Sequence, residues 1–109
     1  MPWLVRGDEV LASLQKADGR RARRRGLLGR TELSGALLIA PARAVHTIGM
    51  KFTIDVAFLD ADGTVVDMVT MRPHRIGRPR LAARSVIEAE AGAFGRWVLR
   101  TGDRLEVRA

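Results

Sequence analysis

The stretch from residue 54 to residue 71 constrains the fold most, because it predicts two adjacent strands joined by a tight turn. Residues 54–59 and 64–71 are mainly apolar, and they flank Asp60-Ala61-Asp62-Gly63. A glycine that follows aspartate suits a hairpin turn whose backbone needs a positive φ angle. Since both segments are apolar on both faces, we expect them to lie in the middle of a layered β structure rather than at its surface.

Elsewhere the chain predicts further short strands and only two helical regions. The helical regions are 20–28, which follows a capping residue at Asp18, and 92–99. The other predicted strands span residues 3–6, 10–14, 37–39, 45–52, 85–90 and 104–108. In the strand 45–52 we expect the register to be disturbed at Gly49. Residues 72–84 carry two prolines and five arginines, so we expect an exposed loop there with a binding or covering role.

Length and composition narrow the class of protein. A chain of 109 residues predicts a single domain, 1–109, with one core. No apolar run approaches the roughly 20 residues that cross a bilayer, and the first residues lack the apolar stretch of a secretory signal. We therefore expect a cytoplasmic protein without a membrane span. The absence of cysteine excludes disulfides, thiolate nucleophiles and cysteine-based zinc sites.

Four blocks, taken together in their order and spacing, resemble the signature of a known family. The first two blocks are residues 23–30 (Arg-Arg-Arg-Gly-Leu-Leu-Gly-Arg) and 35–39 (Gly-Ala-Leu-Leu-Ile). The third block, residues 46–60, contains His46, the pair Met50-Lys51 and the pattern Ile-Asp-x-x-Phe-Leu-Asp. The fourth block is residues 87–92 together with Gly102-Asp103. The blocks cover almost the whole chain. On these residues the chain resembles the bacterial and archaeal family called domain of unknown function 192.

The resemblance implies a fold but no activity. The fold class that it implies is mainly β, a compact single-domain β-barrel or β-sandwich with one or two short helices, which agrees with the elements predicted above. The family is named for its unknown function, so no reaction is implied. Gly49 and Phe52 stand where many members carry tryptophan and asparagine, so this chain lacks the aromatic and amide side chains that those members present there.

Two acids in apolar strands are candidate site residues. Asp55 and Glu88 each sit among apolar neighbours, where a carboxylate must be paired or hydrogen-bonded. Asp55 is either a base or ligand contact, or a structural acid bonded to backbone amides or to an arginine of residues 20–28. Glu88 is either its partner acid, as a hydrolase needs when two carboxyls lie about 5 to 10 Å apart, or the ion-pair partner of Arg23 or Arg24.

The segment that precedes Asp55 supplies the other candidates. In an extended strand His46 and Met50 face one way and Lys51 the other, and a bulge at Gly49 would let the two sets converge. A convergent histidine, lysine and aspartate can hold an anionic or carbonyl substrate. A histidine bonded to the backbone and a lysine that reaches solvent are the plainer alternative.

These residues favour a small ligand- or partner-binding accessory module over an enzyme. Its expected groove contains His46, Met50, Lys51, Asp55, Glu88 and Arg23. The alternatives are a hydrolase that uses Asp55 and Glu88, and a nucleic-acid binder driven by the arginines of 20–25 and a net charge of +7. Without metal-ligand spacing or a phosphate loop, we expect no metal and no cofactor. The expected partner is a small molecule or another protein, and the expected state is a monomer.

Overall fold

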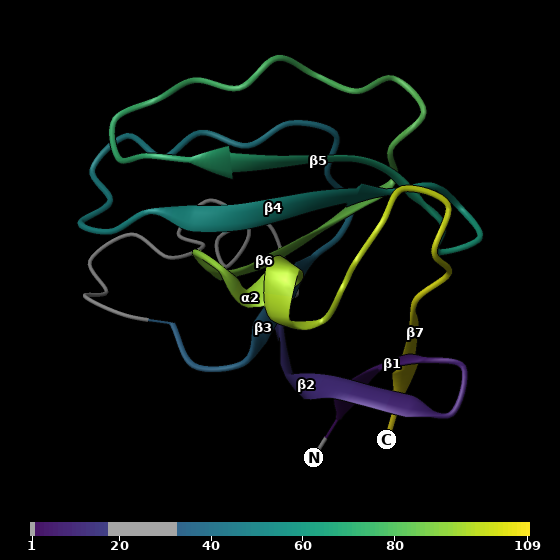
Figure 1. Ribbon diagram of the computed structural model, residues 1–109. Coiled ribbons are helices and arrows are strands. Elements are labelled where there is room, and N and C mark those ends of the chain that lie inside the picture. The colour runs from purple at the N-terminus through teal and green to yellow at the C-terminus, as the bar shows by residue number, and fades with distance from the viewer. Residues whose placement is uncertain (1, 18–32) are drawn as a thin grey trace.

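The computed structural model describes residues 2–17 and 33–109, which form a seven-stranded sheet and one short helix (Figure 1). The elements are β1 (Trp3–Arg6), β2 (Glu9–Ala17), β3 (Ala36–Ile39), β4 (Ile54–Leu59), β5 (Val65–Met71), β6 (Ser85–Glu90), α2 (Ala93–Arg96) and β7 (Glu106–Arg108). The sheet order is β5-β4-β6-β3-β2-β1-β7. Neighbours are antiparallel except β2 and β3. The predicted helix 20–28, with Arg23, lies outside the described residues.

The two ends of the sheet are tied together beside the β4–β5 turn. Thr64 and Arg104 form a bridge, and the Val65 N–H donates to the Asp103 carbonyl at 2.8 Å. Because Arg104 lies just before β7, the chain at one edge of the sheet contacts the start of β5 at the other edge. The sheet is not closed, but its barrel-like shape confirms the predicted mainly β fold class.

The predicted hairpin between β4 and β5 is confirmed, and its turn is built by Asp60. The Asp60 Oδ1 accepts the backbone N–H groups of Asp62 at 2.9 Å and Thr64 at 3.0 Å. Gly63 has a φ of 82°, and a Cβ at this position would stand 2.4 Å from the Leu105 carbonyl oxygen. The turn therefore requires glycine both for its backbone angle and for close packing against the chain before β7.

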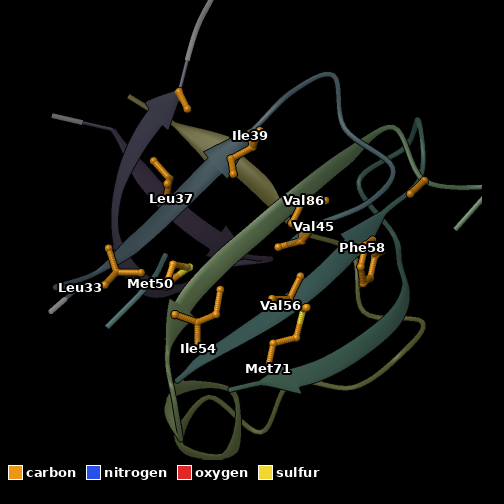
Figure 2. Packing of buried hydrophobic residues seen from close by; sticks show 12 residues of the cluster. Leu33, Leu37, Ile39, Val45, Met50, Ile54, Val56, Phe58, Met71 and Val86 are labelled. Carbon is orange, nitrogen blue, oxygen red and sulfur yellow. The ribbon is translucent and has the colours of Figure 1, made fainter. Parts of the chain in front are cut away.

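β4 is buried along its whole length, which explains its continuous apolar run. Its alternate residues enter two core clusters, one on each face of the sheet. We call these faces the Val56 face, which Figure 2 shows, and the Ala57 face. β5 is only partly buried and forms the outer edge of the sheet, so the prediction of a central strand is correct for β4 and wrong for β5.

The predicted strand 45–52 is also wrong. This segment forms turns and a single bridge, between His46 and Ile76, and Gly49 has a φ of 84°. Its backbone instead bonds to the 72–84 connection, where the Thr47 N–H donates to the Arg75 carbonyl at 2.8 Å and the Gly77 N–H donates to the Val45 carbonyl at 2.9 Å. Two segments without regular structure thus satisfy each other's backbone groups.

Candidate functional site

Asp55 is a buried acid that is hydrogen-bonded within the protein. It lies on the Ala57 face and is 4% exposed. Its Oδ1 accepts the Thr70 hydroxyl at 2.8 Å, and its Oδ2 accepts the backbone N–H groups of Gly92 at 3.0 Å and Phe94 at 3.2 Å. The carboxylate therefore joins β4, β5 and the start of α2 through the backbone-amide bonds that the structural alternative predicts, and a ligand contact by Asp55 stays a prediction.

Glu88 lies on the opposite face of the sheet from Asp55. In the register of the sheet it stands between Leu37 of β3 and Val56 of β4. Since Val56 and Asp55 are consecutive in a strand, their side chains point to opposite faces. The two acids do not share a cleft, and the acid pair of a hydrolase is not formed.

The Glu88 carboxyl is buried without a full set of hydrogen bonds. The side chain is 3% exposed, and its Oε2 has no hydrogen-bond partner among the described residues. Burial raises the pKa of Glu88 to about 7, because desolvation disfavours the charged form. The predicted ion pair with Arg23 or Arg24 involves residues outside the described ranges.

The remaining predicted site residues are not arranged as a strand would place them. His46 and Lys51 are exposed, whereas Met50 is buried in the cluster on the Val56 face. The expected common face of His46 and Met50 is therefore wrong, because the chain turns at Gly49. A role for these residues in binding stays a prediction.

Thr47, which the sequence analysis did not select, holds the arginine-rich connection in place. The side chain is fully buried. Its hydroxyl donates to the Arg72 carbonyl at 2.6 Å and accepts the Arg75 N–H at 2.9 Å, and its own carbonyl accepts the His74 N–H at 2.8 Å. A threonine in a partly apolar segment gives no sequence signal for such a role, since its partners lie more than 20 residues away.

An arginine-lined cleft of about 520 Å³ lies between the end of β5 and this connection. Its lining residues are Val69, Thr70, Met71, Arg72, Arg75, Ile76, Gly77, Arg78 and Arg80. Arg80 is neutralised, because its Nε donates to the Asp67 carboxylate at 2.8 Å, and this hydrogen bond lowers the pKa of Asp67. The other three arginines are exposed, and none of them forms an ion pair with a described carboxylate.

A second cleft, of about 580 Å³, lies on the Ala57 face between β5 and α2. It is lined mainly by apolar groups, including Met68, Phe94, Val98 and Leu99. Val98 follows Trp97, the C-cap of the short helix, and has a φ of 51°, a left-handed angle that β-branched residues rarely adopt. Its side chain is 57% exposed, so this strained turn presents an apolar group to the cleft.

The described residues give no support for a metal centre or a membrane helix. Within residues 2–17 and 33–109, no three histidine or acidic side chains are grouped closely enough to hold a metal ion. No helix in this part of the chain has the length and apolar character needed to cross a membrane.

The fold and the clefts define a small, mainly β domain with a basic cleft and an apolar cleft at one edge of its sheet. The chain belongs to the family domain of unknown function 192 (DUF192, Uncharacterized ACR), whose model matches residues 4–107. The resemblance that the four sequence blocks indicated is thereby confirmed.

Two relatives of this chain come from archaea of the genus Pyrococcus. A UPF0127 protein of Pyrococcus furiosus is 29% identical over 108 residues, which cover 94% of this chain and 93% of that protein. A UPF0127 protein of Pyrococcus abyssi is 44% identical over 62 residues, which cover 57% of this chain and 53% of that protein. The second comparison thus spans about half the length of the relative.

Two crystal structures share the fold. A protein of unknown function from Novosphingobium aromaticivorans matches with a TM-score of 0.82 and 18% identity, over 96% of this chain and 82% of that one. A protein described as a putative transcription regulator from Sinorhizobium meliloti matches with a TM-score of 0.82 and 20% identity, over 97% and 91%. At these identities the likeness shows the fold alone.

Proposed function

We propose that this protein is a non-enzymatic binding module that takes an anionic ligand in the arginine-lined cleft. The observation that carries the proposal is the set of three exposed arginines, Arg72, Arg75 and Arg78, without a carboxylate partner among the described residues. Guanidinium groups suit carboxylates and phosphates because they donate several hydrogen bonds in a planar fork.

The predicted groove around residues 46–55 takes part in this proposal as the support of the cleft. His46 bridges Ile76, which lines the cleft, and Thr47 fixes the backbone of Arg72 and Arg75. The segment therefore positions the arginines rather than supplying the ligand contacts. We propose that the domain acts in this way as a cytoplasmic monomer.

A hydrolase is a weaker reading of the same structure. Acid–base chemistry on one substrate needs both groups within reach of one reacting centre, and Asp55 and Glu88 lie on opposite faces of the sheet. Asp55 is moreover occupied by three hydrogen bonds within the protein. A binding role requires no such pair.

A thermal-shift titration with tripolyphosphate, glutarate and a single-stranded oligonucleotide tests the proposal. An anion at about 100 times its dissociation constant adds about 2.7 kcal/mol to the unfolding free energy, which raises the melting temperature of so small a domain by about 10 °C. Arg78→Gln should abolish this rise. Arg78 is the variant of choice because it is exposed and its guanidinium makes no hydrogen bond with a described residue.

Arg100→Gln is the matched control, because it removes the same charge from an exposed position outside the cleft. It should leave the anion response unchanged. The absence of a response to both small anions, or an equal loss in the two variants, would show that the cleft is not the site. If the oligonucleotide binds wild type and Arg78→Gln equally well, the nucleic-acid alternative is favoured, with other arginines as the binding residues.

A further inference from the structure

The outer edge of β5 has backbone groups that point away from the sheet. The Leu59 carbonyl accepts the Arg84 N–H at 2.7 Å, so the backbone groups of Leu59 face β6. Asp55 lies four residues earlier in the same strand and faces the same way. Thr70 stands directly opposite Asp55 on β5, and in such a non-hydrogen-bonded pair the N–H and C=O groups of both residues point outward.

This edge is only partly closed by the protein itself. The Val65 backbone is paired with residues 102 and 103, and the Met68 N–H donates to the Asp67 carboxylate at 2.9 Å. Beyond Val65, no described segment extends the ladder of β5. In Figure 1 the 72–84 connection runs alongside this strand without joining it. The N–H and C=O of Thr70 are thus left at an exposed position.

The two clefts meet at this edge, one on each face of the sheet. Val69 and Thr70 line both of them. A strand added beside β5 would place its side chains alternately on the two faces. One set would enter the apolar cleft beside Phe94 and Leu99, and the other set would approach the guanidinium groups of the arginine-lined cleft that have no carboxylate partner among the described residues.

We propose that β5 is the docking edge for an extended peptide of alternating apolar and acidic residues, added as an antiparallel strand. In this arrangement the peptide residue opposite Thr70 exchanges backbone hydrogen bonds with it and places an apolar side chain on the Ala57 face. The flanking residues place carboxylates next to Arg72, Arg75 and Arg78. The inference rests on the proposed function, since it names the partner of the same arginine-lined cleft.

Charge favours an acidic peptide over a second copy of this chain. Pairing of β5 with β5 of another copy would bring the two sets of unpaired arginines close together, which like charges oppose. An acidic strand neutralises the same arginines while it satisfies the outward backbone groups of β5. The backbone hydrogen bonds of the added strand provide affinity, and the two clefts determine which peptide side chains fit.

The experiment uses fluorescein-labelled (Glu-Val)5 and fluorescence anisotropy with the full chain. We expect saturable binding that exceeds the binding of Glu5Val5, which has the same composition and charge but no alternation. N-methylation of the valine amides, which face β5, should weaken binding about tenfold or more, since one lost hydrogen bond of about 1.4 kcal/mol changes affinity tenfold. N-methylation of the glutamate amides, which face away from β5, should change it little.

A pair of protein variants tests the edge itself. Thr70→Pro removes the outward N–H without breaking a backbone hydrogen bond to β4, and it also loses the hydroxyl that bonds Asp55. Proline is tolerated at sheet edges, and this variant should weaken the binding of (Glu-Val)5 about tenfold. Thr70→Val keeps this N–H and loses only the hydroxyl that bonds Asp55, so it should keep most of the binding. In the wild-type protein, slower hydrogen exchange of the Thr70 amide upon peptide addition gives the same information without a substitution.

The outcomes separate this inference from the proposed function. If the two methylation patterns have equal effects, the docking edge is wrong. The docking edge is also wrong if (Glu-Val)5 and Glu5Val5 bind equally well and this binding depends on Arg78; the cleft would then be an anion site only, as the proposed function states. If tripolyphosphate and both peptides fail to bind, the proposed function and the docking edge are both wrong. Concentration-dependent dimerisation in light scattering that Thr70→Pro abolishes would assign the edge to a second copy and overturn the peptide.

Discussion

Glu88→Gln should remove a pH dependence of folding stability that the buried carboxyl imposes. The side chain is 3% exposed, and burial raises its pKa from an ordinary 4.5 to about 7. Because the folded state binds this proton more tightly than the unfolded state, the stabilising contribution is complete below pH 4.5 and is lost as the pH rises through about 7. The difference between the two pKa values corresponds to about 3 kcal/mol, at about 1.4 kcal/mol per pH unit.

Urea unfolding followed by tryptophan fluorescence at several pH values from 4.5 to 8.5 measures this contribution. The unfolding free energy of Glu88→Gln, relative to wild type, should rise by about 3 kcal/mol across this range. The buried glutamine amide has its own cost, but that cost does not vary with pH and cancels in the comparison. Glu90→Gln is the control for the loss of a carboxyl that is not buried, since Glu90 lies on the same strand but is exposed and paired with Arg96.

Parallel pH curves for wild type and Glu88→Gln would refute the reasoning. They would mean that the carboxylate has a charge partner in the folded protein, as the sequence-based ion pair with Arg23 or Arg24 supposes. In that case, substitution of both arginines should create the pH dependence of the unfolding free energy that Glu88 is expected to impose, and this result would identify the arginines as the partner.

Three further substitutions test structural roles, each by urea unfolding. Asp55→Ala should cost about 3 to 5 kcal/mol because it removes three hydrogen bonds and leaves the buried Phe94 N–H unpaired. Asp55→Asn should cost about 1 kcal/mol, since its amide oxygen and nitrogen can meet the same partners. Gly63→Ala should cost about 3 kcal/mol of unfolding free energy, because its Cβ would stand 2.4 Å from the Leu105 carbonyl oxygen. Gly7→Ala should cost only about 1 kcal/mol, because Gly7 has a positive φ but no close neighbour. Thr47→Val should cost about 2 kcal/mol and weaken anion binding, whereas Thr47→Ser should be nearly neutral for both. Equal costs within any of these pairs would contradict the role given to that residue.

The sequence determined the elements whose signals are local. The apolar run of β4 and the turn built by Asp60 and Gly63 follow from neighbouring residues in the chain, and the family follows from the order and spacing of four sequence blocks. Local patterns also showed that Asp55 and Glu88 are carboxyl groups among apolar neighbours, where the charged form must be stabilised by hydrogen bonds, as at Asp55, or is disfavoured by a raised pKa, as at Glu88. They further indicated that residues 72–84 form a connection with a potential for binding.

The tertiary structure alone decided how these parts meet. Asp55 and Glu88 fall on opposite faces because the register between β4 and β6 pairs Glu88 with Val56, and a shift by one residue would have placed them on the same face. β5 is an edge strand because of the sheet order, which its own residues do not encode. The arginine-lined cleft exists because Thr47 bonds to residues more than 20 positions away. Strand periodicity and turn chemistry act over a few residues, whereas register, edges and clefts depend on which distant segments pack together.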